Sequence, residues 1–249
     1  MKKIILGLFF VLALGCKRDE PKLPTMEQEV QILASDEFQG RETGTDEELR
    51  AAAYIRELML QTGLKPKGHA GTYYQTFTFK PKKDPHQQTR FQEGGDSTIT
   101  GTNVIGFIDN GSSNTVIIGA HYDHLGYGGE GSLYKGEPAI HNGADDNASG
   151  VAVLLDLAKK IKGAELSENY LFITFSGEEM GLLGSNFFTK NPTLDLEEVS
   201  YMLNLDMVGR LRDDKTLSVS GTGTSPIWPQ VLNAANPGFK LVLDESGVG

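Results

Sequence analysis

Acidic side chains and one histidine-rich segment follow several apolar segments of this 249-residue chain. Carboxylates crowded into one cleft repel each other unless a multivalent cation lies among them or some of them are protonated. Zinc accepts imidazole nitrogen and carboxylate oxygen, and a catalytic zinc keeps one position open for water. We therefore interpret the pattern as that of a metal hydrolase with two zinc ions. The groups, in chain order, are His121 to His124, Asp145 with Asp146, Glu178 with Glu179, and Asp206.

The elements that must position these groups are strands that alternate with helices. Apolar runs rich in β-branched residues precede the groups, and patterns with helical period lie between the runs. This alternation predicts an α/β sandwich on a largely parallel sheet. Ligands of open parallel sheets bind beyond the carboxyl ends of the strands, so we expect the groups to converge on one cleft. The predicted strands are 73–80, 103–108, 115–120, 170–175, 202–205 (buried), 217–220 and 241–244, and the predicted helices are 26–34, 46–61, 148–161, 181–189 and 225–235, with 82–97 a loop.

The first 16 residues have the pattern of a secretory signal. Two lysines precede the apolar run Ile4–Gly15, which is too short to span a bilayer. The single cysteine, Cys16, follows Ala-Leu-Gly, which resembles a bacterial lipobox. We expect Cys16 to carry a lipid anchor that holds an extracytoplasmic protein at the membrane, in the periplasm or at the cell surface of a bacterium. The alternative is a cleaved signal peptide with an incidental cysteine.

Composition and the absence of other motifs exclude several classes of function. The formal net charge of -10 argues against a nucleic-acid partner, since phosphate binding needs a basic face. The G-x-G-x-x-G match at Gly126–Gly131 has no helix after it and does not predict dinucleotide binding. No G-x-S-x-G or H-E-x-x-H occurs. We divide the chain into a signal at 1–16, a charged tether at 17–25 and one domain at 26–249.

The motifs together resemble the M28 family of zinc aminopeptidases. This resemblance implies the zinc-dependent exopeptidase fold, a three-layer sandwich with a mixed, mostly parallel central sheet flanked by helices. It also implies removal of N-terminal residues from peptides through a water that bridges two zinc ions. The alternatives are a carboxypeptidase or glutaminyl cyclase-like enzyme of the same fold, or a non-catalytic peptidase-like binding protein. The matching stretches are Gly119–Gly126, Asn142–Gly150, Phe175–Ser185 and Leu205–Met207, with Leu33–Glu37 and Gly101–Gly106 upstream.

The resemblance also implies a role for each residue of the site. The family tends to have a cis peptide at the position of Asp145-Asp146. By the same resemblance, one zinc is held by His121 and Asp206, the other by Glu179, and both by a bridging Asp145, while Glu178 is the general base and Asp123 orients His121.

One ligand of the family pattern does not occur in this sequence. The second zinc of the family also takes a histidine near the C-terminus, in a Ser-Asp-His-like segment that is not found before Gly249. The other histidines do not fit that motif, and we expect His124 and His141 to be structural or substrate-facing. We therefore expect a domain that is incomplete at its C-terminus, a second zinc site that is weak or empty in these 249 residues, and a fragment without activity.

Overall fold

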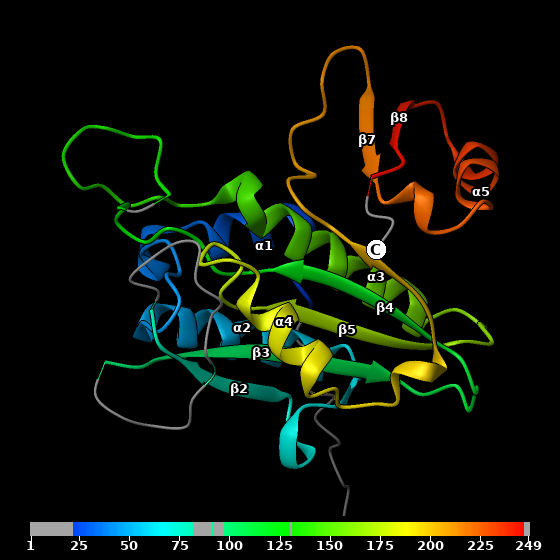
Figure 1. Cartoon of the computed structure of the whole chain (residues 1–249), viewed down its shortest axis with the longest axis horizontal. Coiled ribbons are helices and arrows are strands. Elements are labelled where there is room, and N and C mark those ends of the chain that lie inside the picture. Colours follow the sequence, from blue (N-terminus) through cyan, green and yellow to red (C-terminus); the bar gives the residue numbers. More distant parts are fainter. Residues whose placement is uncertain (1–21, 82–90, 92–96, 130, 247–249) are drawn as a thin grey trace, which may run out of the picture.

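The computed structural model describes residues 22–81, 91, 97–129 and 131–246 (Figure 1). The predicted signal segment, Cys16 and most of the predicted tether lie outside these residues, as does most of the predicted loop 82–97. Within the described parts of the chain, no helix has the length and apolar character that crossing a membrane requires.

A six-stranded mixed sheet lies at the centre of the molecule, in the order β1-β3-β5-β4-β6 with β2 also paired to β3. β4 runs parallel to β5 and β6, whereas β3 runs antiparallel to β1, β2 and β5. The carboxyl ends of β5, β4 and β6 therefore meet at one edge. The strands are β1 (Lys65–Pro66), β2 (Tyr74–Phe79), β3 (Ile99–Ile108), β4 (Thr115–His121), β5 (Asn169–Phe175) and β6 (Val199–Asn204).

Helices cover both faces of this sheet (Figure 1). Every residue of β4 is buried, as expected of a central parallel strand with both faces covered. Its Val116 and Ile118 pack on one face with three helices, and Ile117 packs on the other with the fourth helix. The predicted three-layer α/β sandwich is therefore confirmed. The first face carries α1 (Met26–Leu33), α2 (Asp46–Gln61) and α3 (Gly150–Lys162), and the second carries α4 (Leu183–Lys190).

Local signals explain where the first two helices begin. The side chain of Thr25 accepts a hydrogen bond from the backbone of Gln28, whose side chain accepts one from the backbone of Thr25. Thr45 caps α2 in a similar way, by accepting from the backbone N–H of Glu48. The short 3₁₀ turns lie at Asp36–Phe38, His69–Gly71, Leu196–Glu198 and Thr222–Thr224.

A second, smaller unit follows the main sheet. β7 (Thr216–Ser220) pairs in parallel with β8 (Lys240–Asp244), and α5 (Trp228–Ala235) connects them. Figure 1 shows this unit projecting from the main sheet, with α5 beside the strand pair. The ring of Trp228 contacts Tyr201 of β6 edge-on, with 5.3 Å between the ring centroids.

The prediction that the strand around 202–205 is buried is wrong. Tyr201, Met202 and Leu203 are 41%, 42% and 42% exposed. The reason is the position of β6, which is the last strand of the sheet in the described residues and pairs there with β4 alone. An apolar sequence alone does not distinguish such an edge strand from a central one.

Candidate metal and catalytic site

The candidate site lies at the edge of the sheet where the three parallel strands end. His121 is the last residue of β4, and Glu178 and Glu179 follow the end of β5 after a short turn. Asp206 follows β6 in the same way. A π-helical turn, η3 (Ala144–Ser149), precedes α3 and holds Asp146. The predicted convergence of these four groups occurs because parallel strands end at a common edge.

Two groups of side chains at this edge have the composition of metal ligands. His121, Asp146 and Asp206 form the first group, and His124, Asp146 and Glu179 form the second. In the first, the Nε2 atom of His121 lies 3.1 Å from Asp146 Oδ1 and 3.5 Å from Asp206 Oδ1. In the second, the Nδ1 atom of His124 lies 2.6 Å from Glu179 Oε1 and 4.0 Å from Asp146 Oδ2. Each group combines one imidazole with two carboxylates, and this donor set fits zinc.

The structure places Asp146 between the two groups, whereas Asp145 is the bridging residue that the family resemblance implies. One carboxylate oxygen of Asp146 faces His121 and the other faces His124. The carboxylate of Asp145 instead accepts a hydrogen bond from the backbone N–H of Gly209, at 2.8 Å. Asp146 has φ -108° and ψ 98°, so the backbone leaves helical geometry there and neighbouring side chains point apart. The cis peptide bond also lies one residue later than expected, at Asp146-Asn147.

The buried imidazole of His121 shows how strongly this edge attracts positive charge. Burial disfavours the imidazolium, but the carboxylates of Asp123, Asp146 and Asp206 outweigh this effect and raise the pKa of His121 to about 12. In return, the hydrogen bond from His121 is the main cause that lowers the pKa of Asp146. A divalent cation would neutralise the same carboxylates and take the imidazole as a neutral ligand.

Glu178 lies beside the first group without belonging to either. Its Oε2 atom is 4.0 Å from the Nε2 atom of His121. Burial raises the pKa of Glu178, and the charge of Asp123 acts in the same direction. A partly buried carboxylate of raised pKa next to a metal site suits a residue that accepts and returns a proton. Glu178 and Asp206 also line a cavity of about 240 Å³ together with apolar side chains that include Met202.

Asp123 connects the segment that carries His121 to the turn that carries Glu178 and Glu179. The Nδ1 atom of His121 lies 3.2 Å from the Asp123 carbonyl oxygen and 3.6 Å from its carboxylate. The buried carboxylate also accepts hydrogen bonds from the backbone N–H groups of Glu178 (3.1 Å) and Glu179 (3.3 Å) and from the hydroxyl of Thr43 (3.0 Å). Asp123 therefore lies against the ring of His121 and also holds the turn that carries both glutamates.

Two residues of these groups are not among the ligands predicted from the sequence. His124 was expected not to be a ligand, yet its ring contacts Glu179 and it belongs to the second group. Its spacing of three residues from His121 was a signal, but the family pattern argued against it. Asp146 was missed because its neighbour Asp145 has the same side chain, and only backbone geometry separates the two.

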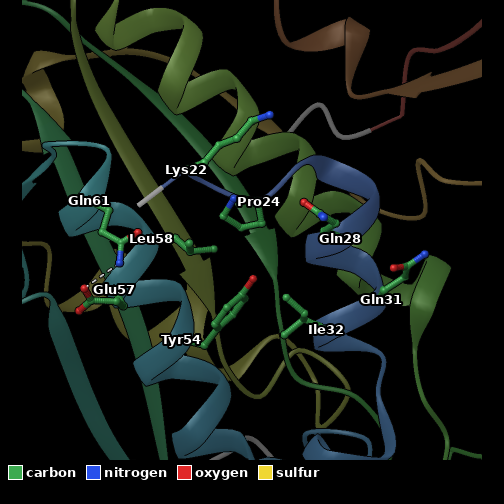
Figure 2. Close-up of a pocket in the computed structure, with 9 residues that line it drawn as sticks. All are labelled: Lys22, Pro24, Gln28, Gln31, Ile32, Tyr54, Glu57, Leu58 and Gln61. Atoms are coloured by element: carbon green, nitrogen blue, oxygen red, sulfur yellow. Dashed lines mark hydrogen bonds between the residues drawn. The ribbon is translucent and has the colours of Figure 1, made fainter. Parts of the chain in front are cut away.

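A larger cavity, of about 450 Å³, is lined by residues that precede all of these groups in the sequence (Figure 2). Residues of α1, α2 and the segment before α1 line it, among them Pro24, Ile32, Tyr54 and Leu58. Among the described residues that line it, Glu57 is the one acidic residue and none is a histidine. Neither of the two groups of metal-ligand type found among the described residues lies in this lining, so the smaller acidic cavity is the candidate site.

Comparison with known proteins decides the family. The model of peptidase family M28 matches residues 103–243, which is more than half of the chain. The chain belongs to peptidase family M28. This family assignment agrees with the resemblance of the motifs.

Curated relatives of this M28 peptidase include a probable leucine aminopeptidase of Trichophyton verrucosum, 40% identical over 113 residues, which are 43% of this chain and 28% of the relative. Aminopeptidase YwaD of Bacillus subtilis is 34% identical over 95 residues, 38% of this chain and 18% of the relative. The chain thus spans less than a third of the length of these two relatives. The alkaline phosphatase isozyme conversion protein of Escherichia coli K12 is 26% identical over 89% of this chain and 61% of its own.

Solved structures confirm the fold. A zinc-dependent exopeptidase from Parabacteroides distasonis aligns with a TM-score of 0.65 and 20% identity, over 90% of this chain and 78% of its own. A glutaminyl cyclase from Bacteroides thetaiotaomicron aligns with a TM-score of 0.64 and 18% identity, over 90% and 79%. At such identities the likeness concerns the fold alone, which is the predicted zinc-exopeptidase fold.

Proposed function

We propose that this M28 peptidase is a zinc-dependent aminopeptidase that hydrolyses N-terminal residues from peptides. The observation that carries the proposal is the pair of imidazole–carboxylate groups that share Asp146, with Glu178 beside them. The aminopeptidase names of the curated relatives support the same reaction. The surplus of carboxylates at the site also favours a substrate that brings a protonated amino terminus.

We propose two zinc sites. His121, Asp146 and Asp206 would hold the first ion, and Asp146 with Glu179 would hold the second. Among the described residues, the imidazole that completes the second group is His124. The C-terminal histidine ligand implied by the family resemblance stays a prediction.

Bound zinc would supply a Lewis acid that polarises the scissile carbonyl and makes a nearby water more acidic. Glu178 would accept the proton of the attacking water and return it to the leaving amine. Its raised pKa suits both steps, because a carboxylate of very low pKa is a weak base. Asp123 would keep Glu178 in place through the hydrogen bond to its backbone.

The variant Glu178→Gln tests this proposal in the full-length protein. Zinc content and hydrolysis of peptides with free and with acetylated N-termini would be measured, with Glu198→Gln as control because Glu198 is exposed and lies just before β6. We expect Glu178→Gln to retain zinc and lose turnover, and wild type and control to cleave only free N-termini. Unchanged turnover in Glu178→Gln would contradict the base role, and cleavage from the carboxyl end would indicate a carboxypeptidase.

Two other outcomes separate the remaining alternatives. Cyclisation of N-terminal glutamine without peptide cleavage would indicate a glutaminyl cyclase-like enzyme. Wild-type protein that binds no zinc and cleaves no peptide would indicate a peptidase-like binding protein.

We also propose that Cys16 carries a lipid and that the domain is held at the membrane on the extracytoplasmic side. The support is the short apolar run that ends at this cysteine. Expression in a bacterium and separation of membrane and soluble fractions would test it. Wild type should sediment with membranes and Cys16→Ala should not, whereas equal distribution of both would contradict the anchor.

A further inference from the structure

Arg41 is a buried arginine whose guanidinium group donates hydrogen bonds to backbone carbonyl groups in the described part of the chain. The side chain is 1% exposed. Its Nε atom donates to the carbonyl of Tyr122 at 2.7 Å, and its two Nη atoms donate to Asn142 at 2.8 Å and Gly143 at 3.0 Å. A further hydrogen bond goes to the carbonyl of Leu33 at the end of α1. One planar group thus connects three segments that are far apart in the sequence.

Two of these segments carry the candidate metal ligands. Tyr122 lies next to His121, and Gly143 lies three residues before Asp146. His121 and Asp146, the latter shared by both groups, therefore lie on two segments whose backbones bind the same guanidinium. The flat five-donor shape of arginine allows this arrangement, whereas a lysine presents a single point charge.

The backbone around Arg41 is built for the same contact. Gln39, Gly40 and Arg41 all have positive φ values, of 43°, 74° and 49°. A Cβ atom on Gly40 would lie 2.6 Å from the carbonyl oxygens of Gly126 and His141, so this turn packs directly against the two loops. The carbonyl of Arg41 also accepts from the backbone N–H of His124 at 3.2 Å. Non-glycine residues rarely adopt positive φ, and the packing of the turn must compensate that strain.

The charge of Arg41 is placed to offset the acidic site. Among the described residues, the printed hydrogen-bond acceptors of its guanidinium are all backbone carbonyl oxygens, so this charge is not used up in a direct hydrogen bond to a carboxylate. Burial lowers the pKa of Arg41 to about 10, and the charges of Asp123, Asp146 and Glu179 oppose this shift. Arg41 is thus a buried cation at neutral pH that reduces the mutual repulsion of these carboxylates.

We propose that Arg41 is a positioning residue that holds the loop of His121 and the loop of Asp146 at the separation that zinc binding requires. The inference rests on the proposed zinc peptidase function and adds a residue outside the ligand set. Arg41 touches neither substrate nor zinc, and its effect passes through the backbones of the two loops.

The test compares Arg41→Gln and Arg41→Lys with wild type in the full-length protein. Arg50→Gln is the matched control, because Arg50 is exposed and also donates to a backbone carbonyl, that of Glu37. Zinc affinity would be measured by competition with a chelator, and kcat and KM on zinc-saturated protein. We expect a loss of zinc affinity of about 10- to 100-fold in Arg41→Lys, as for loss of an outer partner of a metal site. We expect a larger loss in Arg41→Gln, a lower kcat with little change in KM, and no change in Arg50→Gln.

A purely structural role predicts a different result. In that case both variants would melt at a lower temperature, but the folded fraction would keep wild-type zinc affinity and wild-type kcat, and this result would overturn the proposal. If Arg41→Gln does not fold, Arg41→Lys decides, because it retains the buried charge. Wild-type protein that neither binds zinc nor cleaves peptides would refute the proposed function itself, a result that does not depend on any Arg41 variant.

Discussion

A buried carboxyl group, that of Glu48 next to the candidate site, should make the stability of this protein depend on pH. Glu48 of α2 is fully buried. It accepts hydrogen bonds from the hydroxyls of Tyr122 and Ser176 and from the backbone N–H of Gly44. Burial raises the pKa of Glu48 from 4.5 to about 7, although these hydrogen bonds oppose the shift. The folded protein therefore binds a proton at pH values where the unfolded chain has lost it.

The sign and size of the effect follow from that difference. Because the pKa is higher in the folded state, the contribution of Glu48 to the free energy of unfolding is greatest below pH 4.5 and is lost as the pH rises through about 7. Each pH unit between the two pKa values corresponds to about 1.4 kcal/mol. The protein should thus lose about 3 kcal/mol of stability from this group between acid and mildly alkaline pH.

The variant Glu48→Gln isolates this contribution, because an amide does not titrate. Urea unfolding of wild type and variant would be measured from about pH 4 to pH 8.5. Both proteins would be free of zinc, because bound cations would lower the pKa of nearby carboxyl groups. The difference in stability between wild type and Glu48→Gln should shift by about 3 kcal/mol towards the variant as the pH rises. Glu47→Gln, one residue away on the same helix, is the control. A difference between wild type and Glu48→Gln that does not change with pH would refute the reasoning.

Three further predictions concern the site and its support. Asp146→Asn should lower zinc affinity by more than the roughly 10- to 100-fold expected for loss of a residue that only hydrogen-bonds to a ligand, whereas Asp145→Asn should bind zinc like wild type. Equal zinc affinities of the two variants in a chelator titration would contradict the assignment of Asp146. His124→Ala should abolish the weaker of two zinc-binding events in calorimetry, and retention of both events would exclude His124 as a ligand, with His69→Ala as the unaffected control. Gly184→Ala should destabilise the protein by about 1–3 kcal/mol or more in urea unfolding, because the added Cβ would lie 2.2 Å from Asn103 Oδ1 and 2.3 Å from the carbonyl oxygen of Ser176. A variant with the stability of wild type would contradict this prediction and show that these neighbours can move apart.

Much of the fold could be predicted because its signals are local. The bounds of α2 are those expected from Thr45 as N-cap, from the apolar period, and from Gly63 after the last turn. The continuous apolar run 115–120 predicted the strand that forms β4, and all residues of β4 are buried. The convergence of His121, Glu178 and Asp206 was predictable too, since parallel strands share an edge.

Other features depended on contacts between distant parts of the chain. Nothing in the local sequence of Glu48 or Arg41 distinguishes these residues from ordinary charged residues of a helix and a turn. Their roles come from partners 74 residues away at Tyr122 for Glu48, and 101 residues away at Asn142 for Arg41. Likewise, β6 looked buried by composition but is an exposed edge strand in the described residues.

By itself, the sequence determined which residue types gather at one edge of the sheet, and therefore the family and the kind of chemistry. Only the tertiary structure placed Asp146 rather than Asp145 between the two histidines and brought His124 to Glu179. The physical reason is that side-chain type and period are encoded residue by residue, whereas the direction of a side chain in a loop depends on backbone angles. Those angles are set by packing and hydrogen bonds from elsewhere in the fold, such as those of Arg41 to Asn142 and Gly143.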